Sequence, residues 1–132
     1  MNTDYDAQYG LLNEDYAEMI IKEKWNIKDL TKLDYYNKLD FHDKNTNTYY
    51  EIKARRINHS KFNTTMIGYD KIRYAKKLNT DVYFIFIFED GDYYYKFNSN
   101  DTYLTSIGGR NDRGCEEYKP YYYIPISNLI KI

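Results

Sequence analysis

The 132-residue sequence has one cysteine, two prolines, six glycines and no long apolar run. A single cysteine cannot form a disulfide within the chain, which favours a reducing, cytoplasmic compartment. The longest apolar run, Val82–Phe88, has the length of a strand, whereas a membrane-spanning helix needs roughly 20 residues. The polar, acidic start of the chain is unlike a secretory signal peptide. These absences exclude a disulfide-stabilised secreted scaffold, and we expect no membrane partner.

Charge and tyrosine are abundant instead. Charged residues make up 30% of the chain and hydrophobic ones 42%, a balance typical of globular proteins. The 18 tyrosines fit an AT-rich source, such as a phage or virus, better than a tyrosine-lined functional surface. We see no repeat or linker, and we expect a single domain over residues 1–132. Its core is expected at about 10–97, with a C-terminal extension at 98–132.

The small net charge of −1 hides an uneven distribution. Residues 1–52 carry 6 basic and 11 acidic side chains, whereas residues 53–88 carry 8 basic and 2 acidic ones. A basic middle segment beside an acidic first third suggests a polyanion site next to a cation site. A solvated charged face is the alternative interpretation.

Hydrophobic periodicity and turn residues predict an α/β domain with a mixed sheet. The expected helices span residues 10–25 and 66–78, with a loose arm at 1–9 and a polar loop at 58–65. The expected strands span residues 30–37, 38–43, 48–55, 81–88 and 93–97, with a late strand at 121–126 that Pro120 and Pro125 restrict to a sheet edge.

The most informative stretch is the hairpin around the turn at residues 44–47. If Asp43 pairs with Thr48 across this turn, Asp40 lies directly opposite Glu51. Two carboxylates at such a distance repel each other, and a divalent cation such as Mg²⁺ would offset the cost. Lys53 lies two residues beyond Glu51 and shares its strand face. An ammonium group beside a carboxylate pair suits phosphodiester hydrolysis.

Chance offers a competing explanation, because acidic and basic residues often alternate on exposed hairpins. An isolated Glu-x-Lys occurs in most charged proteins. The alternative is therefore an unrelated α/β domain with this spacing by accident, and a structure that placed Asp40 and Glu51 on opposite faces would favour it.

The joint order of these residues resembles the PD-(D/E)xK nuclease superfamily, which has the restriction-endonuclease-like fold. Asp40 matches the first acid of the motif, although Leu39 stands where the motif name has proline, and Glu51-Ile52-Lys53 matches the (D/E)xK element. The spacing from Gly10 to Glu14 resembles the start of the first helix in resolvase-like members. The order is similar to that of archaeal Holliday-junction resolvases. This resemblance implies a mixed central sheet flanked by two helices, in the order α-β-β-β-α-β, plus extra C-terminal strands.

The resemblance also implies roles for particular residues. Asp40, Glu51 and Lys53 would be catalytic, with Lys53 positioning the attacking water. The metal would be Mg²⁺, with Mn²⁺ as a substitute, held by Glu14, Asp40, Glu51 and the backbone carbonyl of Ile52. Glu18 and Glu23 on the same helix are rivals of Glu14 for this role.

Several polar residues near the motif are candidate contacts to nucleic acid. Lys71 lies early in the second helix, which packs near the active site in this superfamily. The candidate set is Arg55, Arg56, Lys61, Thr64, Thr65 and Lys71. For His42 and His59 we prefer an ordinary surface position to a ligand role.

We therefore expect a Mg²⁺-dependent DNA endonuclease, with branched or structured DNA as a candidate substrate and a homodimer as a candidate assembly. A catalytically inactive DNA-binding or interaction protein on the same fold, of the phage or viral accessory type, is the alternative. Metal-linked stabilisation would separate the two, because a binding-only protein should show none.

Overall fold

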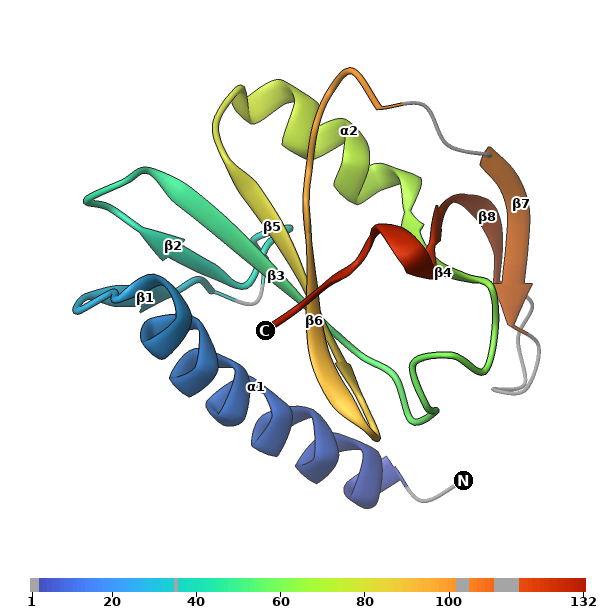
Figure 1. Cartoon of the computed structure of the whole chain (residues 1–132), viewed down its shortest axis with the longest axis horizontal. Coiled ribbons are helices and arrows are strands. Elements are labelled where there is room, and N and C mark those ends of the chain that lie inside the picture. The colour runs from blue at the N-terminus through green and yellow to red at the C-terminus, as the bar shows by residue number, and fades with distance from the viewer. Residues whose placement is uncertain (1–2, 35, 102–104, 111–116) are drawn as a thin grey trace.

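The fold is described from a computed structural model of the chain (Figure 1). It covers residues 3–34, 36–101, 105–110 and 117–132, with side-chain surroundings for 13–34, 36–101, 105 and 120–132. Cys115 lies outside the described residues. The elements are α1 (Thr3–Trp25), β1 (Leu30–Lys32), β2 (Phe41–Asp43), β3 (Thr48–Ala54), β4 (Thr64–Gly68), α2 (Tyr69–Leu78), β5 (Val82–Phe88), β6 (Gly91–Lys96), β7 (Thr105–Arg110), β8 (Glu117–Pro125), a 3-10 turn (Ile126–Asn128) and β9 (Ile130–Lys131).

A mixed six-stranded sheet forms the centre of the molecule, in the order β1-β2-β3-β5-β6-β9. The strands β3 and β5 run parallel, and the other neighbouring pairs are antiparallel. The parallel pair requires a crossover connection, which β4 and α2 supply. The strand β5, which the apolar run at residues 82–88 forms, is buried along almost its whole length.

The two helices cover opposite faces of this sheet (Figure 1). Strand alternation explains the arrangement, because Phe84 and Phe86 of β5 pack with Ile72 of α2, whereas Ile85 packs with Ile21 of α1. The predicted α/β class with a mixed sheet and two helices is therefore confirmed. None of the described helices combines the length and apolar composition that a bilayer span requires.

A second sheet of three strands, in the order β4-β8-β7, lies beside α2. The predicted edge position of the late strand is wrong, because β8 is the central strand of this sheet. Pro120 has a register partner only in β7, and Pro125 only in β4. Each proline thus lies where β8 has a single neighbour, so a missing N–H is tolerated.

Two predicted helix starts are also wrong. The first helix already begins at Thr3, so the expected loose arm is helical up to Gly10. The second begins at Tyr69, because residues 64–68 form β4 instead. Burial along β4 alternates, with Thr65 and Ile67 inward and Met66 outward, which is the period of a strand rather than of a helix.

Candidate active site

The hairpin of β2 and β3 brings Asp40 next to Glu51. The predicted register is confirmed, since Asp43 pairs with Thr48. Asp40 itself lies one residue before β2, and its backbone N–H donates to the carbonyl of Tyr50 at 3.0 Å. Its Oδ2 accepts a hydrogen bond from the Ile52 N–H at 2.7 Å. Asp40 is therefore hydrogen-bonded to β3, the strand that carries Glu51.

The two carboxyl groups lie close together and are largely shielded from solvent. Glu51 is 3% exposed, and Asp40 is partly buried. Burial, the negative charge of Glu51 and a hydrogen bond to Glu51 raise the pKa of Asp40 from 3.8 to about 7. Without metal, these interactions favour a proton on Asp40 at a higher pH than is usual for an aspartate.

Two lysines reach the same oxygen of Glu51. The Nζ of Lys53 lies 3.2 Å from Glu51 Oε2, and the Nζ of Lys71 lies 3.3 Å from it. Lys53 is on β3, two residues beyond Glu51, whereas Lys71 is in the first turn of α2. The side chain of each lysine is only about one-fifth exposed. The structure thus brings together Asp40, Glu51, Lys53 and Lys71 from the predicted set.

This donor set fits a divalent cation such as Mg²⁺. Two adjacent carboxyl groups, held away from water, repel each other when both are ionised, and a hard cation relieves that cost. Among the described residues, no group of three or more His, Cys, Asp or Glu side chains is close enough to share an ion. Further ligands would therefore be backbone carbonyls, such as the predicted one of Ile52, and water.

Glu14 does not join the acid pair. Its carboxylate lies 2.7 Å from the ammonium group of Lys32 on β1. Lys32 is on the same strand as Leu30, two residues away, and Leu30 packs on the α1 side of the sheet. The rival Glu18 pairs with Lys22 at 3.5 Å, and Glu23 is exposed. The spacing from Gly10 to Glu14 suggested this residue, but the spacing alone does not indicate which face of the sheet the helix covers.

Apart from Lys71, which lies beside Glu51, the candidate nucleic-acid contacts divide into two groups. Arg55 is used internally, because its Nη2 donates to the carbonyl of Met66 at 2.6 Å and fastens β3 to β4. Thr65 is 7% exposed, so its hydroxyl group faces the interior. Arg56, Lys61 and Thr64 are exposed on or beside the loop between β3 and β4.

Sequence reasoning missed the loop at residues 33–40, which leads directly into Asp40. Asp34 Oδ1 accepts hydrogen bonds from the N–H groups of Tyr36 at 3.0 Å and Asn37 at 3.1 Å. Leu33 N–H donates to the Asp40 carbonyl at 2.8 Å and closes the loop, and Lys71 Nζ donates to the Lys38 carbonyl. The turn chemistry of Asp34 and Asn37 is the signal that could have found this loop in place of the expected strands.

Neither histidine lies with the acid pair through a described contact. His42 Nε2 is 3.0 Å from Asn47 Oδ1, and its ring packs on Tyr49. His59 stacks on Tyr93 with ring centroids 4.0 Å apart. Both rings are half-buried rather than on the open surface, and the His59 Nε2 is buried without a hydrogen-bond partner among the described residues, so the expected surface position is wrong for His59.

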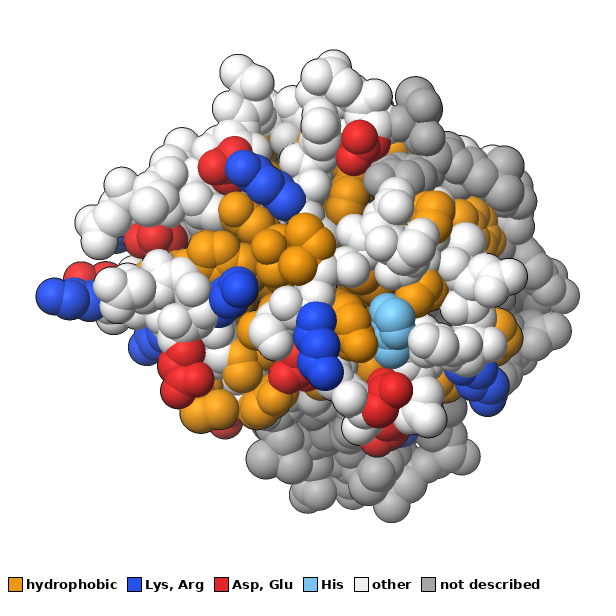
Figure 2. All heavy atoms as spheres, viewed as in Figure 1, with side chains coloured by type: hydrophobic (Ala, Val, Ile, Leu, Met, Phe, Trp, Pro, Cys, Tyr) orange, Lys and Arg blue, Asp and Glu red, His pale blue; other side chains and the backbone are white. Residues whose placement is uncertain are grey.

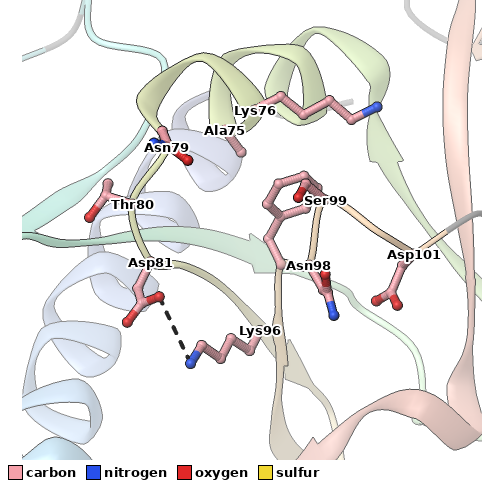
Figure 3. Close-up of a pocket in the computed structure, with 10 residues that line it drawn as sticks. Ala75, Lys76, Asn79, Thr80, Asp81, Lys96, Asn98, Ser99 and Asp101 are labelled. Carbon is pink, nitrogen blue, oxygen red and sulfur yellow. Dashed lines mark ion pairs between the residues drawn. The ribbon is translucent and has the colours of Figure 1, made fainter.

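An open pocket of about 530 Å³ lies at the other end of α2 (Figure 3). Its lining mixes charges, with Lys96 lying 3.8 Å from Asp81. Neither Asp40 nor Glu51 lines it. On the face shown in Figure 2, acidic and basic side chains also alternate around hydrophobic ones, without a broad surface of one sign. The chemistry of the acid pair, rather than pocket size, therefore identifies the candidate site.

The whole chain matches the model of one protein family. The model of the family described as "Phage putative PDDEXK endonuclease" matches residues 1–132, which is the whole chain. The chain therefore belongs to this family and to the PD-(D/E)xK nuclease superfamily. Comparisons with curated proteins and with solved structures give no match.

Proposed function

We propose that this protein is a metal-dependent endonuclease that hydrolyses phosphodiester bonds in DNA. The observation that carries the proposal is the pair formed by Asp40 and the buried Glu51, with Lys53 Nζ 3.2 Å from Glu51. The name of the family supports the reaction class. We propose Mg²⁺ as the cation, with Mn²⁺ as a substitute, because carboxylate and carbonyl oxygens suit both ions.

Asp40, Glu51 and the carbonyl of Ile52 would hold the cation. When bound, it would supply positive charge to the phosphate and lower the pKa of a water molecule. Asp40 is fastened by its hydrogen bond to the Ile52 N–H, and Glu51 by its lysine partners. These contacts orient both carboxylates before substrate arrives, which reduces the reorganisation that the reaction requires.

Lys53 has the position of a group that acts on the reacting phosphate. Its ammonium group is held at 3.2 Å from Glu51 on the same strand face, and its side chain is 22% exposed. From there Lys53 would hydrogen bond the attacking water and balance the negative charge that develops on the phosphate oxygens. The partial burial strengthens that interaction, since water screens it less.

Branched or otherwise structured DNA is the substrate that we favour. Support comes from Tyr36, which lies four residues before Asp40 and is 91% exposed, and whose N–H group donates to Asp34 Oδ1. Exposed aromatic rings stack on unpaired bases, and a backbone fixed in advance lowers the entropic cost. Arg56 and Lys61, both exposed, would contact phosphate groups beyond the site.

The test is cleavage of supercoiled plasmid and of a four-way junction in Mg²⁺, Mn²⁺ or EDTA. Wild type should cut only with metal, and both Lys53→Ala and Asp40→Asn should lose at least about 100-fold in rate. Tyr36→Ala should lose more on the junction than on plasmid, whereas Tyr36→Phe, which keeps the exposed ring, should not. Folded wild type that cuts neither substrate would favour the inactive DNA-binding protein instead.

A homodimer belongs to the same proposal. Two copies would present two acid pairs, one for each strand of a duplex. Light scattering after gel filtration measures the assembly, and a monomer that makes double-strand cuts in a single binding event would contradict this part of the proposal.

A further inference from the structure

One oxygen of Glu51 takes two ammonium groups, which is more than the reaction requires. Lys53 and Lys71 lie 3.2 Å and 3.3 Å from Oε2. Glu51 is 3% exposed, so water contributes little to balancing its charge. In the metal-free protein the two lysines are therefore the cations that stabilise the ionised form of Glu51.

The two lysines are held differently. Lys53 shares the strand of Glu51, and its described ion pair is with Glu51 alone. Lys71 approaches from α2, and its Nζ also donates to the backbone carbonyl of Lys38. Lys71 can therefore release Glu51 and still keep a hydrogen-bond acceptor, which lowers the cost of moving.

A cation that binds Glu51 must compete with these ammonium groups. Positive charges a few ångströms apart in a partly buried site repel strongly, so a bound cation would displace at least one of them. The carbonyl of Lys38 would still accept a hydrogen bond from Lys71, and the displaced ammonium group would remain close enough to Asp40 to interact with its charge. From there it would face the phosphate that the cation attracts.

We propose that Lys71 is an exchangeable counter-ion of the active site. It neutralises Glu51 while the metal is absent, and it binds a phosphate oxygen of the DNA once the metal has displaced it. This proposal rests on the proposed function, because it assigns a second task to a residue of the same site. It makes Lys71 a competitor of the metal and a partner of the substrate at once.

The two tasks give Lys71→Gln effects of opposite sign. Removing the competing charge should tighten Mn²⁺ binding by about 3–10-fold, measured by calorimetry. Removing the phosphate contact should weaken DNA binding by about 3–10-fold, measured with Ca²⁺ in place of Mg²⁺ to prevent cleavage. Lys71→Arg keeps the charge and should resemble wild type in both. Lys76→Gln, which removes an exposed lysine from the same helix, is the matched control for Mn²⁺ binding.

Unfolding temperatures provide a readout that is independent of DNA. In EDTA, Lys71→Gln should unfold at a lower temperature than wild type, because buried Glu51 loses one of its two partners. Saturating Mg²⁺ should narrow that gap, because the cation replaces the missing charge. A lysine that merely packs against β3 would leave the gap unchanged.

The outcomes separate the two proposals. Wild type that binds no Mn²⁺ contradicts the proposed function, and the exchange at Lys71 fails with it. Wild type that binds Mn²⁺, together with Lys71→Gln that binds it equally well or more weakly, overturns the Lys71 proposal alone. Tighter Mn²⁺ binding with weaker DNA binding supports it.

Discussion

Asp40 Oδ2 accepts a hydrogen bond of 2.7 Å from the backbone N–H of Ile52. A side-chain carboxylate thus takes a position at the end of the β2–β3 ladder that a backbone carbonyl would ordinarily occupy. The bond ties Asp40 to the strand of Glu51, and it keeps two acids together that would otherwise separate. Holding the two acids together lowers the stability of the metal-free protein when both are ionised, because the two negative charges repel each other.

Asp40→Asn should stabilise the metal-free protein at neutral pH. The amide oxygen can still accept from Ile52, while the charge beside Glu51 disappears. The pKa of Asp40 is raised to about 7 in the folded protein, above its value in the unfolded chain. The stability that protonated Asp40 contributes is therefore fully present below about pH 4 and is lost as the pH rises through 7. We expect a gain of about 1–3 kcal/mol at pH 8.

Urea unfolding in EDTA at pH 5 and pH 8 measures this gain. The advantage of Asp40→Asn over wild type should be smaller at pH 5 than at pH 8. Asp81→Asn, which removes an exposed acid at 3.8 Å from Lys96, is the control and should not stabilise. A destabilised Asp40→Asn at pH 8 would contradict the described proximity of the two carboxyl groups.

Metal binding should release a proton below neutral pH. Because the pKa of Asp40 is raised to about 7, a cation must displace that proton, and the apparent affinity should fall by up to about tenfold for each pH unit below 7. Calorimetry of Mn²⁺ binding at pH 6, in two buffers of different ionisation enthalpy, counts the protons. His42→Gln, which removes a ring that packs on Tyr49 rather than on the acid pair, is the control and should preserve the effect.

Glu14 and Glu51 should differ sharply in their effect on metal binding. Glu14 forms an ion pair with Lys32 at 2.7 Å, whereas Glu51 is hydrogen-bonded to the side chain of Asp40. Glu51→Gln should therefore abolish measurable Mn²⁺ binding, and Glu14→Gln should leave the affinity as in wild type. Loss of binding in Glu14→Gln would show that α1 contributes to the metal site after all, as the resemblance to resolvases implied.

Arg55 and the pair Arg56 and Lys61 should also behave differently. Arg55→Ala breaks the 2.6 Å bond to the Met66 carbonyl and should lower the free energy of unfolding by about 1–2 kcal/mol. Arg56→Ala with Lys61→Ala removes exposed charges and should lower the free energy of unfolding by less than Arg55→Ala does. The double substitution should instead reduce the slope of log affinity for DNA against log salt, by about 1 for each phosphate group that the protein no longer neutralises. An unchanged salt slope would remove these two residues from the DNA path.

Local patterns predicted the site better than they predicted its surroundings. The turn at residues 44–47 determines the register, so the pairing of Asp43 with Thr48, and with it the proximity of Asp40 and Glu51, could be inferred from the sequence. Lys53 followed from the alternation of strand faces. Its distance to Glu51 confirms that they share a face.

Tertiary packing decided the features that were missed. Residues 64–68 pair with a strand more than fifty positions later, and no local signal reports that partner. The prolines of β8 indicated an edge strand. However, β4 and β7 pair with different parts of β8, so each proline has a neighbouring strand on one side only. Similarly, the spacing that highlighted Glu14 carries no information about the ion pair with Lys32.

The central claim is that Asp40 and Glu51 together hold a divalent cation, and anomalous diffraction from crystals grown with Mn²⁺ tests it most directly. The account predicts a peak within about 2.0–2.4 Å of one oxygen from each carboxylate, with Lys71 Nζ moved away from Glu51. A crystal saturated with Mn²⁺ that shows no peak between these two side chains, or a peak beside Glu14 instead, would contradict it.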